Sequence, residues 1–408
     1  MRILYVTQIV PYPPHGGVLQ RGFNLLRELG RRHEVHLLAF HHPDELPPGE
    51  AVERSRQHLG QFCRSLEYFP LWPKQSRAHK LAAFAAGAVY PRPFSVLAHR
   101  SAALARRVTE ICNGPARPDV VHLDTIALAP YLQHCGSVPA VLAHHNIESQ
   151  LMARRADYES GPARWYVRAQ AQRLVDFERE QAGRFPLNIT VSSADSALLE
   201  KICPGVRTAA VPNGVDTEYF SPRPGEETPA LIYTGGMNMF ANRDAVEWFL
   251  DAIWPRIKAA VPEVKFFAIG QRPSPRVLAA AAADPAVEAP GFVDDVRPWV
   301  ARSAVYVVPL RVGGGTRLKM VDAMAQGKAI VATTIGAEGI EGVDGEHFIL
   351  ADEPEQFAQA VVRLLRDKDA MRKLGAAARK RAEERYAWPI LGQRLAEHYE
   401  RVIEDSRR

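Results

Sequence analysis

The sequence has few cysteines and no long apolar segment. Its four cysteines, among 408 residues, lie far apart and form no Cys-x-x-Cys pair, so neither a zinc site nor a disulfide framework is indicated. No apolar run approaches the roughly 18–20 residues that a membrane-spanning helix needs. The first residues also lack the charged and long apolar regions of a signal peptide. We therefore expect a cytoplasmic protein without transmembrane helices.

Two common ligand-binding patterns are missing as well. No Gly-x-Gly-x-x-Gly opens the first expected helix, which disfavours a nicotinamide enzyme. The one Asp-x-Asp, formed by Asp367 and Asp369, lies between two expected helices. It suits a helix cap better than a metal-diphosphate site. We expect no metal ion and no other cofactor.

Positive charge is concentrated in the first half of the chain. Residues 1–213 hold 25 Lys/Arg against 18 Asp/Glu, whereas residues 214–408 hold 26 against 28. No acid occurs between Glu67 and Glu110. That stretch combines cations with aromatic residues, namely Lys74, Arg77, Lys80, Arg92, Arg100, Arg106 and Arg107 beside Trp72, Phe84, Tyr90 and Phe94. Such a composition suits an anionic membrane surface or an anionic acceptor, but charge runs more often mark only a solvated helix face.

Short apolar segments alternate with longer amphipathic ones, which predicts βαβ units and parallel sheets. Expected strands of the first half are Ile3–Val6, Val35–Phe40, Val120–Leu123, Ala140–Ala143 and Ile189–Val191. Those of the second half are Ala230–Tyr233, Val264–Ile269, Val305–Val308, Ala329–Ala332 and Phe348–Leu350. A Pro- and Asn-Gly-containing linker, Val211–Pro222, separates the two sets. The pattern predicts an α/β protein with two doubly wound domains, residues 1–212 and 213–386, and a terminal helix within 387–408.

The strongest local signal is a glycine-rich segment after the expected strand Val305–Val308. It ends where a helix is expected to begin and consists of Gly313, Gly314, Gly315 and Thr316. Glycines let backbone N–H groups approach a ligand, and a helix N-terminus favours a negative diphosphate. Arg317 and Lys319 add cations in the first turn, where they oppose the helix dipole unless an anion lies between them. Asp322, one turn later, is placed to accept hydrogen bonds from ribose hydroxyls.

Together, motifs spread along the chain resemble the family-four retaining glycosyltransferases of the GT-B fold. In chain order they are Gly16-Gly17, His144-His145-Asn-Ile-Glu148, Ser192-Ser-Ala-Asp195, Pro212-Asn-Gly-Val-Asp216, Gly291-Phe-Val-Asp294, the glycine segment and Gly336-Ala-Glu-Gly339. The resemblance implies two facing Rossmann-like domains with a cleft between them. The N-terminal domain would receive the acceptor, the C-terminal domain would bind the donor, and the terminal helix would pack back on the N-terminal domain.

The resemblance also implies the reaction. A sugar would move, with retained anomeric configuration, from a UDP- or GDP-linked donor to a saccharide or lipid-linked acceptor, as in polysaccharide or glycoconjugate biosynthesis. Peripheral contact with an anionic membrane is expected, and no nucleic-acid partner. His145 would line the reacting centre, and the loop of Gly16 and Gly17 would close over the diphosphate. The other implied donor-binding residues are Gly236, Asn238, Arg243, Gly313, Gly314, Gly315, Thr316, Arg317, Lys319 and Asp322.

The chain departs from the family pattern at two places. Of two family glutamates eight positions apart, the first is Gly314 here and the second is Asp322. The family also grips the diphosphate with an Arg and then a Lys, where this chain has Met237 and Arg243. We expect cations of the glycine-rich segment's helix to compensate for the lost arginine.

Two other functions remain open from the sequence. One is a nucleotide-sugar 2-epimerase on the same fold, which needs acid and base carboxylates and no acceptor. The other is a non-catalytic nucleotide-sugar binder. Purified protein given a donor separates the three cases, since the products are free nucleotide, isomerised donor or unchanged donor.

Overall fold

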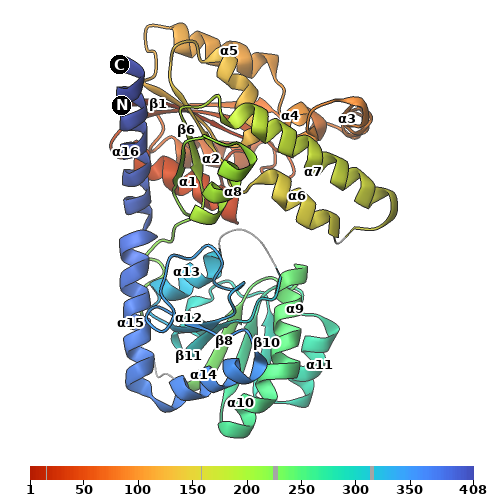
Figure 1. Ribbon diagram of the computed structural model, residues 1–408, viewed down its shortest axis with the longest axis vertical. Coiled ribbons are helices and arrows are strands. Elements are labelled where there is room, and N and C mark those ends of the chain that lie inside the picture. Colours follow the sequence, from red (N-terminus) through yellow and green to blue (C-terminus); the bar gives the residue numbers. More distant parts are fainter. Residues whose placement is uncertain (15, 158, 224–227, 313–316) are drawn as a thin grey trace. The chain divides into compact units, whose positions relative to one another are not determined.

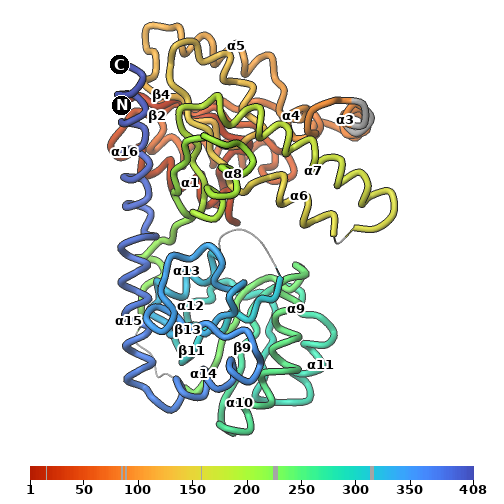
Figure 2. The backbone as a smooth tube through the Cα atoms, viewed as in Figure 1, coloured from red at the N-terminus to blue at the C-terminus, as the bar shows by residue number. Residues whose placement is uncertain are grey.

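The computed structural model describes residues 1–408 except 15, 158, 224–227 and 313–316, and except the side chains of residues 84, 85, 88 and 89. The chain forms two compact units (Figures 1 and 2). Unit 1 comprises Met1–Asn213 together with Leu391–Arg408, and unit 2 comprises Gly214–Ile390. Each unit is built around a sheet of parallel strands, in agreement with the alternating pattern of the sequence.

The sheet of unit 1 has the order β3-β2-β1-β4-β5-β6-β7. Its strands are β1 (Arg2–Thr7), β2 (Glu34–His41), β3 (Ser65–Pro70), β4 (Val120–Leu123), β5 (Ala140–Ala143), β6 (Leu187–Thr190) and β7 (Thr208–Ala210). Central strands are almost wholly apolar because both of their faces are covered by helices. The chain winds outward from β1 to β3 and then resumes at β4 on the other side of β1. The carboxyl ends of β1 and β4 therefore form a topological switch point, where open parallel sheets bind ligands.

Helices connect these strands. They are α1 (Gly17–Gly30), α2 (Glu50–Leu59), η1 (Trp72–Lys74), α3 (Arg77–Val89), α4 (Phe94–Ala98), α5 (Ala102–Asn113), η2 (Ile126–His134), α6 (Glu148–Asp157), α7 (Gly161–Ala182) and α8 (Ser193–Ile202). Serine side chains cap the starts of α3, α5 and α8. The last helix, α16 (Trp388–Arg407), belongs to unit 1 from Leu391 onward. It packs closely on α1, because a Cβ added to Gly392 would lie 2.4 Å from Cβ of Glu28.

The sheet of unit 2 has the order β10-β9-β8-β11-β12-β13. Its strands are β8 (Thr228–Thr234), β9 (Lys265–Ile269), β10 (Val287–Gly291), β11 (Ser303–Val308), β12 (Ala329–Ala332) and β13 (Ile349–Leu350). Its helices are α9 (Phe240–Trp248), η3 (Phe249–Ile253), α10 (Trp254–Ala260), α11 (Pro275–Ala283), α12 (Arg297–Ala301), α13 (Leu318–Ala325), α14 (Pro354–Arg366) and α15 (Lys368–Arg385). Here the switch point lies between β8 and β11.

Each strand expected from the apolar pattern is present, with ends that differ by a few residues. Three further strands, β3, β7 and β10, were not expected. β3 and β7 are the two edges of the first sheet, and β10 is an edge of the second. Edge strands are covered less completely than central ones, so they need no continuous apolar run.

Candidate active site

A buried carboxylate lies at the switch point of unit 1. Asp124 directly follows β4, and its N–H donates to the carbonyl oxygen of Val6 in β1 at 3.0 Å. This bond extends the pairing of β1 with β4 by one residue beyond the end of β4. The side chain of Asp124 is only 3% exposed. A buried charge of this kind is costly unless polar neighbours compensate it.

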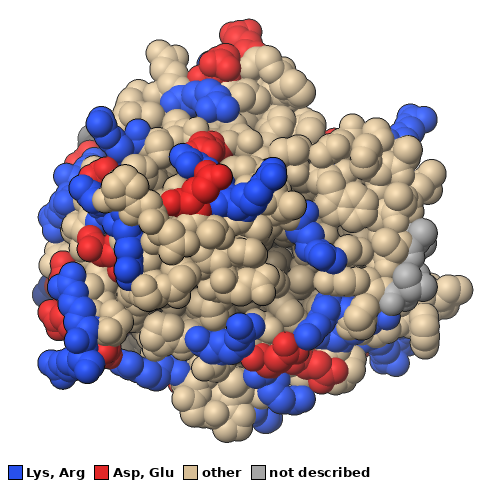
Figure 3. Space-filling model, turned by 90° about the horizontal axis from the view of Figure 1, so that it is seen from above, with Lys and Arg blue, Asp and Glu red and all other residues tan. Residues whose placement is uncertain are grey.

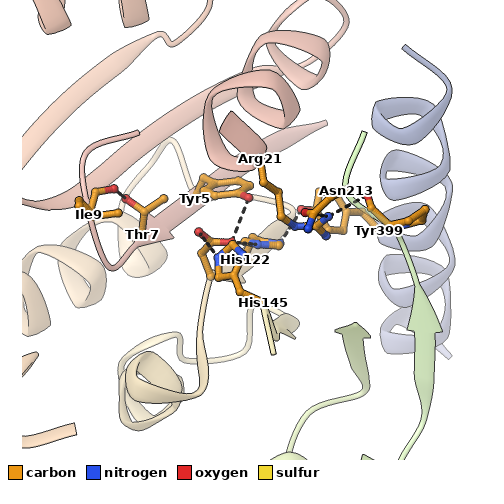
Figure 4. Close-up of polar contacts among 10 residues, drawn as sticks. Tyr5, Thr7, Ile9, Arg21, His122, His145, Asn213 and Tyr399 are labelled. Carbon is orange, nitrogen blue, oxygen red and sulfur yellow. Dashed lines mark hydrogen bonds and ion pairs between the residues drawn. The ribbon is translucent and has the colours of Figure 1, made fainter. Parts of the chain in front are cut away.

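Those neighbours come from five separate segments of unit 1. We call the following set the Asp124 cluster (Figure 4): Tyr5, Arg21, His122, Asp124, His145 and Tyr399. The Tyr5 hydroxyl and Nε2 of His122 each lie 3.3 Å from Oδ1 of Asp124. Nε2 of His145 lies 3.1 Å from Oδ2 of the same carboxylate, an ion-pair distance. That contact lacks hydrogen-bond alignment within the described structure.

The cluster keeps Asp124 ionised. Burial alone would raise the pKa of the Asp124 carboxyl, but the imidazoles of His145 and His122 lower it below its ordinary value. Burial lowers the pKa of His122 despite the nearby carboxylate, so this ring is neutral near pH 7. Burial also raises the pKa of both phenols, Tyr5 and Tyr399, well above the ordinary value. Both tyrosines are therefore hydroxyl donors.

Arg21 supplies a second buried charge. It lies on α1 and is 2% exposed. Its guanidinium donates to the carbonyl oxygen of Pro212 at 2.9 Å and to Oδ1 of Asn213 at 3.3 Å. Burial lowers the pKa of Arg21, while Tyr5 and Asp124 raise it. The helix that follows Gly16 and Gly17 is thus tied to the segment at which unit 1 ends.

The two adjacent histidines after β5 differ in environment. Nε2 of His144 lies 3.0 Å from Oδ1 of Asn188 on β6. Burial lowers the pKa of His144 to about 4, so this ring stays neutral. His145 instead contacts Asp124 at the carboxyl edge of the sheet. Glu148, at the start of α6, has its pKa raised by burial and lowered in part by His145. His145 is therefore the member of this pair that is placed for chemistry.

An ammonium group lies at the switch point of unit 2. Lys319, on α13, reaches back to the end of β8. We call the following set the Lys319 cluster: Tyr233, Gly235, Asn242 and Lys319. Nζ of Lys319 donates to the Tyr233 hydroxyl and to Oδ1 of Asn242, each at 2.7 Å. It also lies 4.3 Å from the centre of the Tyr233 ring. Asn242 in turn donates to the carbonyl oxygen of Gly236 at 2.9 Å, which fixes the turn between β8 and α9.

The charge of Lys319 has no carboxylate partner within the part of the chain that the structure describes. Burial, and secondarily the nearby Arg317, lower the pKa of Lys319 to about 7. Gly235 makes this approach possible, since a Cβ at that position would lie 2.5 Å from Nζ and its φ is +153°. The arrangement is a desolvated cation beside a glycine turn at a sheet's carboxyl edge.

Two other polar residues at α13 have different surroundings. Arg317 precedes the helix and is buried, with Nε bonded to the carbonyl oxygen of Ile335 at 3.1 Å and a terminal nitrogen 3.3 Å from Glu338. Oδ1 of Asp322 is buried without a hydrogen-bond partner among the described residues. Burial raises the pKa of Asp322 to about 7.

The remaining predicted donor residues are partly described. Arg243 lies on α9 with its guanidinium 5.7 Å from the Phe240 ring centre. Met237, at the family's arginine position, is packed into the core of unit 2. Gly236 and Asn238 belong to the turn that precedes α9. The predicted residues Gly313, Gly314, Gly315 and Thr316 lie outside the described residues, and α13 is described from Leu318 onward.

Both halves of the chain match known sequence families. Residues 15–219 match the family described as Glycosyltransferase Family 4, and residues 228–367 match the one described as Glycosyl transferases group 1. The chain belongs to Glycosyltransferase Family 4. Its two doubly wound parallel sheets are those of the GT-B fold, as expected from the sequence. The protein is therefore a glycosyltransferase.

Curated relatives of this family 4 protein include two mannosyltransferases. The MMP alpha-(1->4)-mannosyltransferase of Mycolicibacterium hassiacum is 26% identical over 339 residues, which cover 79% of this chain and 78% of the relative. The phosphatidyl-myo-inositol mannosyltransferase of Mycobacterium tuberculosis is 28% identical over 215 residues, which cover 48% of this chain and 55% of that protein.

Solved structures share the whole fold. The Anabaena protein HepE in complex with UDP has a TM-score of 0.67 at 16% identity, with 98% of this chain and 99% of that chain covered. Sucrose-phosphate synthase from Thermosynechococcus elongatus has a TM-score of 0.65 at 16% identity and covers 99% of this chain and 100% of its own. At such identities the likeness establishes the fold alone.

The sequence interpretation missed five members of the Asp124 cluster, namely Tyr5, Arg21, His122, Asp124 and Tyr399. One signal was available, because Asp124 is a carboxylate placed directly after the apolar strand Val120–Leu123. Residues in that position point to the ligand edge of a parallel sheet. No sequence pattern links Tyr399 to His122, which lies 277 residues earlier.

The basic stretch of unit 1 is partly neutralised. Lys74 pairs with Asp44, Arg92 with Glu180, and Arg107 with Glu67. On the face seen in Figure 3, Lys and Arg side chains are interspersed with Asp and Glu. Among the described helices, none is long and apolar enough to cross a membrane. Nor do the described His, Cys, Asp and Glu side chains include a group of three that could hold a metal ion.

Proposed function

We propose that the protein transfers a hexose from a nucleotide-diphosphate sugar to a saccharide or lipid-linked acceptor, with retention at the anomeric carbon. The observation that carries the proposal is the Lys319 cluster, a desolvated cation without an anionic partner in the described structure, placed where doubly wound sheets bind nucleotides. A diphosphate supplies the missing anion. Negative charge develops on the leaving diphosphate in the transition state. A preorganised cation stabilises that charge and so lowers the activation barrier.

The donor grip relies on residues of the chain rather than on a metal ion. Lys319 takes the place of the cation lost at Met237, since its ammonium lies at the same β8–α9 turn. Arg243 and Arg317 add positive charge, and Asp322 offers a buried carboxylate oxygen for the ribose. Gly236, Asn238 and the glycine segment are proposed as backbone contacts. EDTA should therefore leave turnover unchanged.

The names of the relatives support the hexose and the acceptor class. Two of them are mannosyltransferases, and one of these acts on phosphatidyl-myo-inositol, a lipid. HepE was solved with UDP, which supports a uridine or related nucleotide as the carrier. His145, held by Asp124, is proposed to act beside the reacting carbon, and the loop of Gly16 and Gly17 beside the diphosphate.

A lipid-linked acceptor requires contact with a membrane surface. Unit 1 offers two candidate contacts. Arg77, Lys80 and Leu81 lie exposed on α3, and Leu81 is 72% exposed. At the start of α7, Trp165 is 75% exposed beside the exposed Arg164. Exposed tryptophan and arginine suit the headgroup region of an anionic bilayer.

Ligand-induced stabilisation tests the donor class. A thermal-shift panel of UDP, GDP, ADP and their common sugars should show a higher melting temperature with one nucleotide series, because a ligand that binds only the native state stabilises it by mass action. Product NMR then reports the anomeric configuration. An inverted product would refute retention, and no response to any nucleotide would refute the donor site.

Membrane contact is tested by sedimentation with vesicles of phosphatidylglycerol and phosphatidylcholine. Binding should rise with the anionic fraction, fall with salt and weaken in Arg77→Glu/Lys80→Glu. Lys368→Glu/Lys373→Glu, on unit 2, is the matched control. If the protein does not bind anionic vesicles at low salt, membrane contact is refuted and a soluble acceptor explains the data better.

A further inference from the structure

The C-terminal helix contributes a buried hydroxyl to the Asp124 cluster. The Tyr399 hydroxyl lies 2.7 Å from Nδ1 of His122. Both side chains are almost completely buried, and Figure 4 shows Tyr399 extending from α16 toward the His122 ring. Water is therefore excluded from this contact, and Tyr399 and His122 must satisfy one another.

The two hydrogen-bond partners of His122 fix its tautomer. Ionised Asp124 can only accept, so the proton of the neutral imidazole lies on Nε2, which donates to Oδ1 of Asp124 at 3.3 Å. Nδ1 is then the acceptor, and the neutral phenol of Tyr399 donates to it. The opposite tautomer would direct a nitrogen lone pair at the carboxylate. The ring has little freedom to avoid it, because Tyr5 stacks on it at 4.1 Å and 17°.

The orientation of the Asp124 carboxylate follows. Oδ1 accepts from both His122 and Tyr5, which leaves Oδ2 directed at His145, 3.1 Å away. Nε2 of His145 has no hydrogen-bond partner in the described structure, so this ion-pair contact with Asp124 is what holds that nitrogen. A rotation of the carboxylate would therefore move the negative charge away from His145.

We propose that Tyr399 is a positioning residue for the transfer reaction: its hydroxyl donates to Nδ1 and holds the His122 ring in place, and the Nε2–H of that ring orients the Asp124 carboxylate against His145. The inference rests on the proposed role of His145. Tyr399 touches neither donor nor acceptor and acts through two intermediate side chains. The packing of α16 in unit 1 therefore influences the geometry of the reacting centre through Tyr399.

The first test is Tyr399→Phe in the full chain, which keeps the ring and removes the hydroxyl. Turnover should fall about tenfold while KM for the donor stays within about twofold, because Tyr399 contacts none of the proposed donor-binding residues that the structure describes, most of which belong to unit 2. Tyr386→Phe is the matched control, since it removes another buried hydroxyl that accepts the N–H of Glu341. It should lower stability without that selective loss of kcat. Equal kcat in wild type and Tyr399→Phe would overturn the proposal.

The second test measures the Tyr399–His122 hydrogen bond directly. Long-range ¹H–¹⁵N spectra of histidine-labelled protein, with His122→Gln used for assignment, should show Nε2–H and a hydrogen-bonded Nδ1 in wild type, and in Tyr399→Phe an Nδ1 resonance shifted toward that of a nitrogen without a hydrogen bond. An unchanged Nδ1 resonance would refute the proposal. Because this readout needs no substrate, it remains decisive even if His145→Ala turns over normally and the proposed role of His145 is wrong.

A double-mutant cycle separates positioning from general destabilisation. In a His122→Gln background the imidazole that Tyr399 holds is absent. Adding Tyr399→Phe should then change kcat less than twofold, whereas it lowers kcat about tenfold in wild type. Equal effects in both backgrounds would show that Tyr399 acts by another route and would contradict the proposal.

Discussion

If Lys319 holds the diphosphate, donor binding must be coupled to proton uptake. The free protein holds the pKa of Lys319 at about 7 because the ammonium is desolvated. A diphosphate placed beside it restores a counter-charge and returns the pKa toward its ordinary value. At pH 8 about 9% of the free Lys319 side chains are charged, so each bound nucleotide should take up about 0.9 proton.

The same linkage sets the pH dependence of affinity. Above pH 7 the association constant should fall about tenfold per pH unit, or ~1.4 kcal/mol, since a neutral lysine must first be protonated. Below pH 6 the lysine is already charged, and this contribution to proton uptake should vanish. This pH dependence of affinity is opposite in sign to the one expected for a carboxylate that must ionise in order to bind.

Isothermal titration calorimetry in two buffers of different ionisation enthalpy measures the uptake. The nucleotide's terminal phosphate also titrates, so the quantity of interest is the difference between wild type and Lys319→Arg. The arginine variant remains charged at pH 8 and should lose the uptake. Equal proton uptake by the two proteins at pH 8 would refute the assignment of Lys319 to the diphosphate.

Three further predictions follow from individual side chains. Arg317→Ala should weaken nucleoside-diphosphate binding by ~1.5–3 kcal/mol, the scale of a charge-assisted hydrogen bond, and leave nucleoside binding nearly unchanged; calorimetry checks this against Arg311→Ala, which breaks an exposed ion pair with Asp244. His145→Ala should lower kcat at least tenfold with donor affinity unchanged, whereas His144→Ala should mainly lower the melting temperature; a uniform loss of both in His145→Ala would indicate a structural histidine. Asp322→Asn should stabilise the protein more at pH 8 than at pH 5, because the raised pKa of about 7 makes ionised Asp322 costly in the native state, by at most ~4 kcal/mol; a pH-independent difference in denaturation midpoints would contradict it.

The central strands of the fold are readable from the sequence because burial on both faces demands a nearly continuous apolar run. Val120–Leu123 and Ala140–Ala143 were expected with their observed bounds. β3 and β10 were not, since an edge strand tolerates Glu67 in one case and Pro290 in the other. The hydrophobic pattern therefore predicts the central strands, which form the switch points, better than the edge strands β3 and β10.

The candidate site is only partly readable for a related reason. His145 follows a strand and belongs to a recognisable motif, so local sequence identifies it. Lys319 was expected to bind the diphosphate, but its approach to Gly235 depends on how α13 packs against β8. Tyr399 is invisible to local reasoning because its partner His122 is distant in sequence and adjacent only in the folded unit. Contacts of this kind arise from packing, which no short motif encodes.

The most direct test of glycosyl transfer is the fate of a donor sugar on the purified protein. With the nucleotide sugar selected by thermal shift, the protein should slowly release free nucleoside diphosphate, faster when acceptor is added and equally fast in EDTA, and Lys319→Ala should release it at least tenfold more slowly. Recovery of isomerised donor, or of donor bound but unchanged in the presence of acceptor, would contradict the account.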